Sequence, residues 1–372
     1  ELNISLLLTD SRSIKTPSET LFFAIKSKTN DGHKFIEELY KKGVRNFVVE
    51  QELPIFSTFK GVNIIRVKNS IKALQKIASA HRKRFKVPVI GITGSNGKTI
   101  VKEWLNQLLQ PNYFITRSPR SYNSQIGVPL SVWELEQRTT LAIFEAGISQ
   151  PHEMEALSEI IAPTIGIFTC IGDAHQEGFN STTEKLNEKL KLFKDTKTII
   201  YNASQNNIKD AIERLYPERE LIGWSSQDTS APLYIKEISK SDNIASVTYI
   251  YKGKEENFKI PFIEDGSIEN AIHTLCTMLF CFNITPQEAA KRLLGIEPVA
   301  MRLEVKEGKN NCTIINDTYN SDINSLEIAL DFLSRRSILE GGTRRLILSD
   351  ILQSSSNEVE LYSKIAKLLK EK

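Results

Sequence analysis

The fold of this chain is decided by the stretch Val87-Pro88-Val89-Ile90-Gly91-Ile92-Thr93-Gly94-Ser95-Asn96-Gly97-Lys98-Thr99. Its first part is a short β-branched run, which is typical of a buried parallel strand. After Thr99, apolar residues recur at positions 100, 101, 104, 105, 108 and 109, the spacing of one helix face. The stretch therefore predicts a strand joined to a helix N-terminus by a glycine-rich turn.

A turn of this kind can bind phosphate groups. Backbone N–H groups and the positive end of the helix dipole point at one spot, where Lys98 adds a charge and Thr99 adds a hydroxyl suited to Mg²⁺. The motif is a short P-loop, because Ile92 stands where the general pattern has glycine. A polyphosphate is the expected ligand, and a purely structural turn is the alternative.

Composition and length narrow the class of protein. With 372 residues, 25% charged and 40% hydrophobic, the chain is long enough for two or three globular domains. The net charge of +3 is too small to indicate nucleic acid as the main partner. Four cysteines, Cys170, Cys276, Cys281 and Cys312, lack metal spacing and predict free thiols in a reducing cytoplasm. No apolar stretch is long enough to predict a membrane span.

The order of predicted elements favours an α/β fold in which a mostly parallel sheet is covered by helices on both faces. Residues 1–86 alternate short strands and helices, and their basic run 81–84 is expected to be a solvated helix end. Residues 87–298 continue the alternation and end in an antiparallel hairpin, near 246–251 and 258–262, and two helices. Residues 299–372 predict strands at 312–316 and 345–349 and helices at 324–334 and 358–370, a short unit that is expected to be incomplete.

Polar residues after the predicted strands are candidates for chemistry, because open parallel sheets bind ligands beyond the carboxyl ends of their strands. Glu145 follows the apolar run 141–144, where a carboxylate could bind Mg²⁺ beside the phosphates. His175 lies in the loop after the strand predicted at 165–170. Lys189 borders the buried face of the helix predicted at 183–194, and the residues alone favour a snorkelling lysine there.

Seven motifs in order resemble the signature of the Mur ligases, over residues 9 to about 350. They are Gly94-x-x-Gly97-Lys98-Thr99, Asn123-Ser124-Gln125-Ile126-Gly127-Val128-Pro129, Glu145-Ala146-Gly147, Ala174-His175-x-Glu177-Gly178-Phe179, Asn270-Ala271, Arg302-Leu303-Glu304 and Asn316-Asp317-Thr318-Tyr319-Asn320. The polar clusters 9–12 and 31–33, considered by themselves, are typical of turns. Within the family, they are most similar to the corresponding segments of the members that join D-alanyl-D-alanine to UDP-N-acetylmuramoyl-tripeptide.

The resemblance implies three domains: 1–86 for the UDP-sugar, 87–298 for ATP, and 299–372 as a Rossmann-like domain that closes over the nucleotide. It also implies a reaction of peptidoglycan synthesis. ATP would phosphorylate the tripeptide carboxylate, and the D-alanyl-D-alanine amine would attack the acyl phosphate. The resemblance also leads us to expect an alanine racemase domain after the ligase. We expect the present chain to be a monomer.

The resemblance also assigns roles to residues. The nucleotide would be held by Gly94, Ser95, Asn96, Gly97, Lys98, Thr99, Asn270 at the adenine, Asp317 at the ribose and Arg302 at the phosphates. Magnesium ions would be held by Thr99, Glu145 and His175, and Lys189 would be carbamylated. The substrate would be held by Ser11, Arg12, Asp31, Gly32, His33 and Asn123.

Several positions depart from the family pattern. They are Arg120-Ser121 in place of Gly-Asn, Ser124 in place of Asn, Lys191 in place of an acid, and Gly266-Ser267 in place of His-Asn. Two alternatives therefore remain beside the D-alanyl-D-alanine ligase. One is another member of the superfamily, the ligase that adds the third peptide residue or folylpolyglutamate synthetase. The other is a nucleotide-binding module without catalysis.

Overall fold

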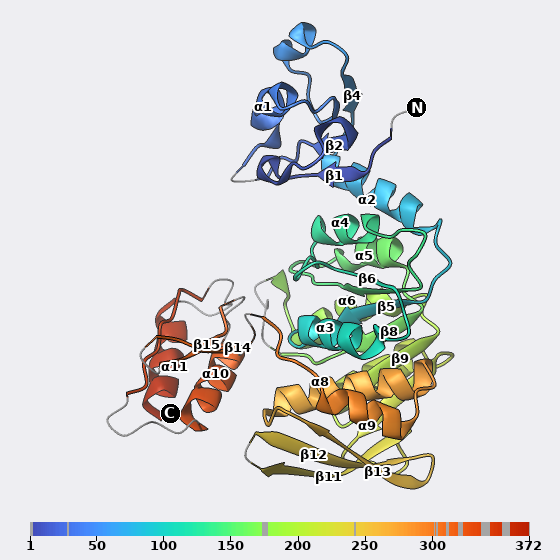
Figure 1. Ribbon diagram of the computed structural model, residues 1–372, viewed down its shortest axis with the longest axis vertical. Coiled ribbons are helices and arrows are strands. Elements are labelled where there is room, and N and C mark those ends of the chain that lie inside the picture. The colour runs from blue at the N-terminus through green and yellow to red at the C-terminus, as the bar shows by residue number, and fades with distance from the viewer. Residues whose placement is uncertain are drawn as a thin grey trace.

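The computed structural model describes residues 3–27, 30–172, 178–241, 243–300, 302, 304–309, 312–318, 323–335, 343–351 and 358–371. Its strands form a four-stranded, a nine-stranded and a two-stranded sheet. Figure 1 shows the units that contain these sheets: the N-terminal unit and the central unit follow one another along the long axis, and the C-terminal unit lies to one side. The predicted α/β class, with parallel sheets flanked by helices, is confirmed.

The N-terminal unit is built on a wholly parallel sheet in the order β1-β2-β3-β4. Its middle strands are buried, and the rings of Phe22 and Phe47 meet edge to face with centroids 6.4 Å apart. The elements are β1 (Leu6–Leu8), β2 (Thr20–Phe23), α1 (Ile36–Lys41), β3 (Asn46–Val49), β4 (Asn63–Arg66) and α2 (Ser70–Arg82).

Helix α2 connects the N-terminal unit to the central one. Asn69 caps its start by accepting a hydrogen bond from the backbone N–H of Lys72 at 2.8 Å. At its end Arg82 is buried, and its guanidinium donates to the carbonyl oxygens of Ile161 at 2.9 Å and Ala162 at 3.1 Å. The expectation of a solvated basic helix end is therefore wrong for Arg82, because these carbonyls satisfy its donors inside the junction.

The central sheet places the glycine-rich turn after an interior strand, the third from its β6 edge. Strand β5 (Val89–Thr93) is fully buried and pairs in parallel with β7 (Leu141–Glu145) and β8 (Ile165–Phe168). The full order is β13-β12-β11-β10-β9-β8-β5-β7-β6, with only the β11-β12 and β12-β13 pairs antiparallel. The other strands are β6 (Ile115–Arg117), β9 (Thr198–Asn202), β10 (Glu220–Ser225), β11 (Leu233–Ser241), β12 (Ile244–Tyr251) and β13 (Lys254–Ile260).

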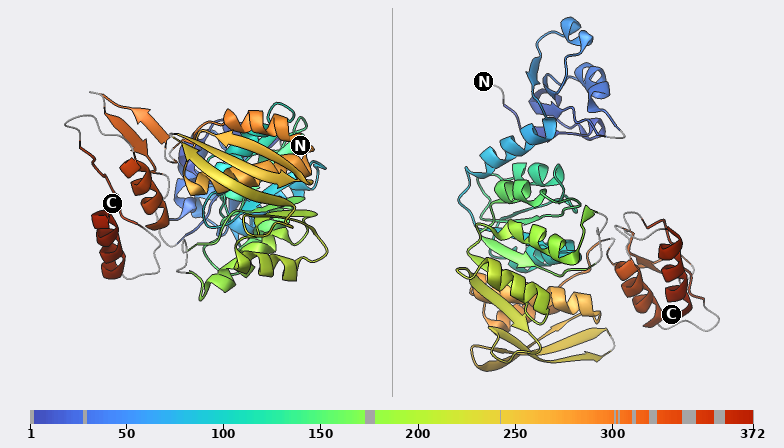
Figure 2. Two further views of the ribbon diagram at one scale, coloured as in Figure 1. Left: turned by 90° about the horizontal axis from the view of Figure 1, so that it is seen from below. Right: turned by 180° about the vertical axis from the view of Figure 1, so that it is seen from behind.

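Helices cover both faces of this sheet, as Figure 2 shows from two sides. One apolar cluster joins the sheet to α3, α8 and α9, and a second joins it to α4, α5, α6 and α7. The helices are α3 (Lys98–Leu109), α4 (Gly127–Trp133), α5 (Met154–Ile161), α6 (Thr182–Leu190), α7 (Asn206–Leu215), α8 (Asp265–Cys276) and α9 (Pro286–Leu294). None of the helices in the described ranges combines the length and the apolar character needed to cross a membrane.

The C-terminal unit pairs β14 (Glu304–Glu307) with β15 (Thr313–Asn316) and packs α10 (Ile323–Arg335) against α11 (Glu358–Glu371). The strand predicted at 345–349 is wrong: these residues have no regular secondary structure, and Ile347 is 98% exposed. A strand needs a neighbour for its backbone hydrogen bonds, and this segment pairs with none of the described strands.

Candidate active site

Two glycines shape the turn between β5 and α3. Both adopt left-handed backbone angles, with φ of +143° at Gly94 and +85° at Gly97. A Cβ at Gly94 would lie 2.0 Å from Thr169 Oγ1, and one at Gly97 would lie 2.4 Å from Asn270 Oδ1. Both the backbone conformation and the close neighbours therefore require glycine at each position.

The turn is fixed to the end of β8. The backbone N–H of Ser95 donates to the Cys170 carbonyl at 2.8 Å, and its hydroxyl exchanges hydrogen bonds with backbone atoms of Gly172 at 3.0 and 3.2 Å. The hydroxyl of Thr169 donates to the Asn96 carbonyl at 2.5 Å. The glycine-rich turn is thus held in place by contacts within the protein.

Lys98 and Lys189 converge on this turn from different helices. Lys98 Nζ donates to the carbonyl oxygens of Gly94 and Ser95, both at 2.9 Å, and Lys189 Nζ donates to the Gly94 carbonyl at 3.0 Å. Burial lowers the pKa of Lys189 well below its usual value, and the nearby charges of Lys98 and Lys185 lower that pKa further. The lowered pKa increases the share of the neutral amine, which is the nucleophilic form of lysine.

Sequence reasoning missed Lys185, which lies one helical turn before Lys189. Its side chain is fully buried, and its Nζ donates to the Gly172 carbonyl. The spacing of four residues places both lysines on one helix face and is the signal that could have identified it. Lys191, by contrast, forms ion pairs with Glu155 and Glu188, each at 2.8 Å.

Thr99 and Glu145 meet across the turn, as their positions in the sequence predict. Thr99 Oγ1 donates to Glu145 Oε2 at 3.0 Å, and Asn123 Nδ2 lies 3.4 Å from the same oxygen. The described residues hold no group of three or more His, Cys, Asp and Glu side chains placed to bind a metal. One carboxylate beside a hydroxyl still fits Mg²⁺, which usually takes one or two carboxylates and completes its shell with phosphates and water.

Two further observations complete this part of the site. Glu145 Oε1 pairs with the buried ammonium of Lys102 at 2.9 Å, a contact that sequence reasoning also missed. His175, the predicted ligand of a second ion, lies outside the described residues.

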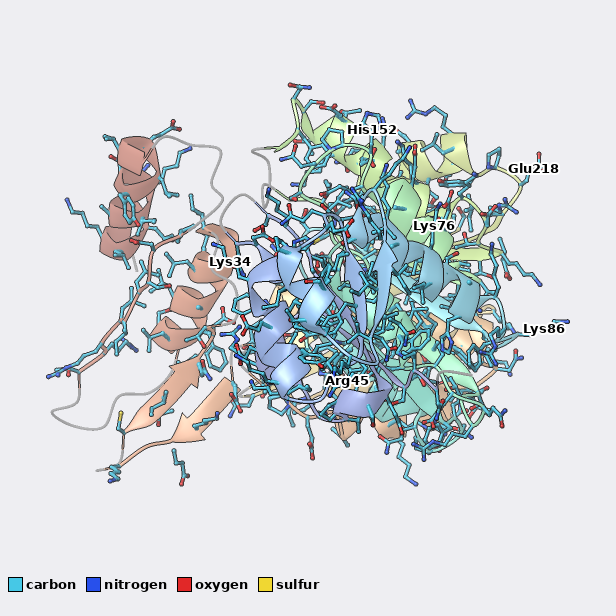
Figure 3. The ribbon with its side chains drawn as sticks, turned by 90° about the horizontal axis from the view of Figure 1, so that it is seen from above. Lys34, Arg45, Lys76, Lys86, His152 and Glu218 are labelled. Carbon is cyan, nitrogen blue, oxygen red and sulfur yellow. The ribbon has the colours of Figure 1, made fainter. Side chains whose placement is uncertain are left out.

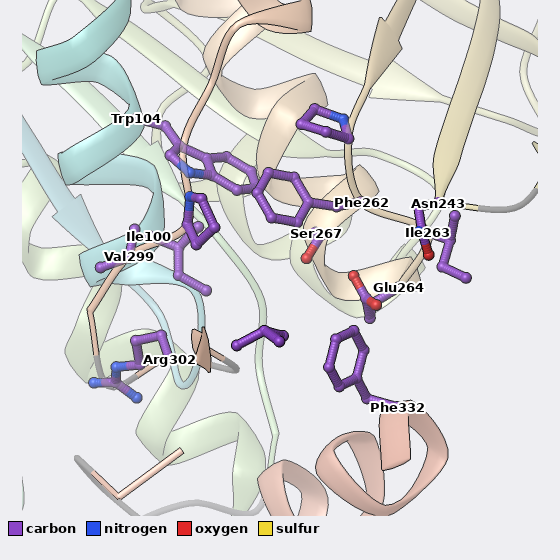
Figure 4. A pocket seen from close by; sticks show the side chains of 13 residues that line it. Ile100, Trp104, Asn243, Phe262, Ile263, Glu264, Ser267, Val299, Arg302 and Phe332 are labelled. Atoms are coloured by element: carbon purple, nitrogen blue, oxygen red, sulfur yellow. The ribbon is translucent and has the colours of Figure 1, made fainter. Parts of the chain in front are cut away.

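The residues predicted at the nucleoside end are not all together. Asn270 is buried on α8 against Gly97, so it faces the phosphate turn. Arg302 lines a separate cavity of about 230 Å³, whereas Asp317, after β15, is not among the lining residues. Figure 4 shows the Trp104 and Phe262 rings on one side of this cavity and Phe332 of α10 facing them. The two stacked rings have centroids 5.2 Å apart.

The predicted substrate residues of the N-terminal unit belong to two turns. Ser11 is buried, and Arg12 is exposed in an ion pair with Asp10 at 2.7 Å, which lowers the pKa of Asp10 to about 2. Figure 3 looks down on this unit from above, with the central unit behind it and the C-terminal unit beside it.

The second turn, 31–33, is held from within the unit. His33 is buried, with Nδ1 2.6 Å from Asp31 Oδ1, while its Nε2 accepts a hydrogen bond from the Glu50 N–H at 3.1 Å. Both ring nitrogens are thus engaged inside the unit. A Cβ at Gly32 would lie 2.8 Å from the backbone nitrogen of Ile25, so the turn packs tightly on β2 and its following residues.

Comparison with known proteins identifies the family. Residues 92–278 match the Mur ligase middle domain, and residues 3–82 match the Mur ligase family catalytic domain. The UDP-N-acetylmuramoyl-tripeptide–D-alanyl-D-alanine ligase of Bacillus subtilis is 28% identical over 93% of this chain and 73% of its own length. The ligase of the same name from Borreliella burgdorferi is 31% identical over 87% of this chain and 70% of its own length.

A solved structure agrees with this assignment at the level of the fold. The MurF ligase of Thermotoga maritima, in complex with ADP, superposes with a TM-score of 0.76 at 22% identity and covers 91% of this chain and 76% of its own. The matched sequence models and the shared fold together show that the chain belongs to the Mur ligase family, the ATP-dependent amide-bond-forming ligases, and is MurF-like over most of its length.

Proposed function

We propose that this chain joins D-alanyl-D-alanine to UDP-N-acetylmuramoyl-tripeptide in the synthesis of peptidoglycan precursors. The names of the relatives from Bacillus subtilis and Borreliella burgdorferi support these substrates. In the proposed reaction an oxygen of the tripeptide carboxylate attacks the γ-phosphorus of ATP and ADP leaves. The dipeptide amine then attacks the acyl carbon, loses a proton and expels phosphate.

The observation that carries this proposal is the arrangement around the Gly94 carbonyl. Lys98 and Lys189 both donate to this oxygen, and the Thr99–Glu145 pair lies at the start of the same helix, α3. Phosphoryl transfer depends on positioning and on charge that balances the transferring group. The turn is suited to both, because it leads into the N-terminus of α3 and the Lys98 ammonium lies beside it.

Thr99 and Glu145 are the proposed residues for Mg²⁺, with His175 proposed for a second ion. When bound, the ion neutralises phosphate charge that would otherwise repel the substrate carboxylate. The carboxyl end of β7 holds Glu145 in a fully buried position, so its side chain is fixed before nucleotide binds.

Lys189 is proposed to be carbamylated. The neutral amine attacks the carbon of CO₂, a nitrogen–carbon bond forms and one proton is released. Full burial and the lowered pKa of Lys189 favour the reactive neutral amine. The carbamate that forms is an anion, so it would place a negative charge beside Lys98 and Lys185.

The cavity beside α3 is the proposed site for the adenine. Its stacked Trp104 and Phe262 rings offer an apolar face, and Glu264 and Ser267 supply polar groups at its edge. Arg302 reaches the same cavity and would approach the phosphates, while Asp317 is proposed to contact the ribose. The uridine end is proposed to bind the N-terminal unit at Ser11, Arg12 and the 31–33 turn, with Asn123 facing the peptide.

Phosphate release with a panel of substrates tests the proposal. We expect release only when ATP, UDP-N-acetylmuramoyl-tripeptide and D-alanyl-D-alanine are all present, with loss when the dipeptide or tripeptide is omitted. Activity with UDP-N-acetylmuramoyl-dipeptide and a diamino acid would instead indicate the ligase for the third residue. Activity with folate and glutamate would indicate a folylpolyglutamate synthetase, and nucleotide binding without release from any pair would indicate a non-catalytic module.

A further inference from the structure

Lys102 lies beneath the proposed active site, one helical turn after Lys98 on α3. Its side chain is 0% exposed. The ammonium lies 2.9 Å from Glu145 Oε1 and 3.1 Å from Glu103 Oε1. An isolated buried ammonium is unfavourable, so these two carboxylates are what allow a lysine at this position.

The same ammonium binds the segment 118–123, which runs between β6 and α4. Lys102 Nζ donates to the Ser118 carbonyl at 2.8 Å and to the Arg120 carbonyl. This segment also carries Ser121, whose hydroxyl lies 2.8 Å from Thr99 Oγ1, and Asn123, whose amide approaches Glu145. Lys102 therefore contacts the helix, the end of β7 and the segment at once.

The ammonium of Lys102 contacts only one of the two oxygens of Glu145. It lies 2.9 Å from Oε1, which is also 3.3 Å from Thr99 Oγ1, whereas Oε2 is closer to Thr99 Oγ1, at 3.0 Å, and is the oxygen that Asn123 Nδ2 approaches. An ammonium has three donors and no acceptor, so it can hold the carboxylate and the two carbonyls together. Removing it would leave Glu145 as a buried anion with only the neutral donors Thr99 and Asn123, and would release both carbonyls.

We propose that Lys102 is a positioning residue that orients Glu145 and fastens segment 118–123 to α3. Glu145, which is proposed to bind Mg²⁺, and segment 118–123, which is proposed to face the peptide, are then fixed relative to each other. The inference rests on the proposed function for the ligands of Glu145 and Asn123, but the fastening itself does not depend on which peptide is bound.

Hydrogen exchange of the intact protein, measured without substrate, tests the fastening. In Lys102→Met we expect the hydrogen-bonded amides of segment 118–123, those of Ser118 and Tyr122, to exchange at least tenfold faster than in the parent protein. We also expect Mg²⁺ to lose most of its effect on the binding of a non-hydrolysable ATP analogue. The matched control is Glu103→Gln, which removes the other carboxylate around the ammonium. Glu103 also accepts from Arg117 Nε at 2.9 Å, and the glutamine amide oxygen can still accept this bond, so exchange and Mg²⁺ dependence should stay close to those of the parent.

A double variant covers the case in which Lys102→Met does not fold because the buried Glu145 has lost its cationic partner. Lys102→Met with Glu145→Gln removes that buried charge, and exchange at 118–123 should still be fast because the carbonyls have lost their donor. In Glu145→Gln alone, exchange should stay slow, because the ammonium keeps both carbonyls and Glu103. Slow exchange in the double variant, or unchanged Mg²⁺ dependence in a folded Lys102→Met, would overturn the inference. A failed substrate panel would reject the proposed function and leave the exchange result standing.

Discussion

The side-chain nitrogens of Lys98 and Lys189 share one acceptor, the carbonyl oxygen of Gly94, at 2.9 and 3.0 Å. The two lysines are 91 positions apart in the sequence and come from α3 and α6. Two amines this close cannot both carry a charge without a cost when they are buried. One of them is therefore suited to binding phosphate as a cation, and the buried one to modification.

Lys98→Met should abolish ligation and leave the fold intact. Lys98 is the proposed point charge on the transferring phosphoryl group, and such charges are worth about 10³-fold or more in rate. Steady-state phosphate release with saturating substrates measures the effect, and circular dichroism checks the fold. Lys194→Met, at an exposed position after α6, is the control and should retain activity. Turnover of Lys98→Met within tenfold of the parent would remove the turn from the mechanism.

Lys189→Ala should be inactive, and a short carboxylate in the buffer should restore part of the activity. The alanine leaves a buried space beside Gly94, where acetate or formate can supply the anion that a carbamate would provide. Activity is measured against carboxylate concentration, with Lys98→Met as a variant that the same salts should not rescue. Full activity of Lys189→Ala without any added anion would show that this lysine is structural.

His273 should make the stability of the central unit depend on pH. Trp224 Nε1 donates to its Nδ1 at 3.3 Å and its Nε2 donates to the Thr169 carbonyl at 3.1 Å, so protonation of Nδ1 would break the bond from Trp224 while the bond to Thr169 remains. Burial lowers the pKa of His273 from 6.5 to about 4. Between these values the unfolded chain binds the proton and the folded chain does not. Stability should therefore be complete above about pH 6.5 and should fall by about 3 kcal/mol as pH drops to about 4.

The variant His273→Gln tests this directly, because glutamine keeps a donor and an acceptor but does not titrate. Urea unfolding at several pH values should give a flatter dependence in the variant than in the parent. The control is His152→Asn, at an exposed histidine before α5. Equal pH dependence in the parent and in His273→Gln would contradict the assignment.

Substitution of Trp104 should weaken nucleotide binding if the adenine binds in the cavity beside α3. Trp104→Leu keeps an apolar side chain but removes the ring that stacks on Phe262, so ATP affinity should fall by roughly tenfold, about the 1.4 kcal/mol typical of an aromatic contact. Isothermal titration with a non-hydrolysable analogue measures the loss. Trp133→Leu, at the junction with α2, is the control, and equal effects of the two substitutions would place the adenine elsewhere.

Local patterns were sufficient to predict the central features. The β-branched run, the two glycines and the amphipathic spacing after Thr99 predicted β5, the turn and α3, because each feature depends on neighbours in the sequence. Glu145 was expected beside Thr99 because parallel strands end at the same edge of the sheet, and their side chains lie 3.0 Å apart. The edge hairpin was also expected, although its second strand is β13 at 254–260.

Features that depend on distant partners were not predicted. Lys102, Lys185 and Arg82 are buried cations, and sequence patterns place such residues at the surface unless their acceptors are known. Strand β11 was missed because its last six residues are exposed, so its composition resembles a loop. Segment 345–349 gave the opposite error: it has the composition of a strand, but a strand also needs a partner.

Gly97→Ala should damage the phosphate turn more than its backbone angle alone would. A left-handed residue with a side chain costs about 1–2 kcal/mol, and the added Cβ would also collide with Asn270. Gly253→Ala is the matched control, since Gly253 has a φ of +75° with nothing within 4 Å of the new Cβ. Both variants should lose a similar amount of unfolding free energy, because each places an alanine in a left-handed backbone conformation. Only Gly97→Ala should also lose ATP affinity, by tenfold or more. Titration calorimetry measures the ATP affinity and thermal unfolding measures the stability. Equal ATP affinity in both variants would mean that Asn270 and the turn can move apart without weakening nucleotide binding.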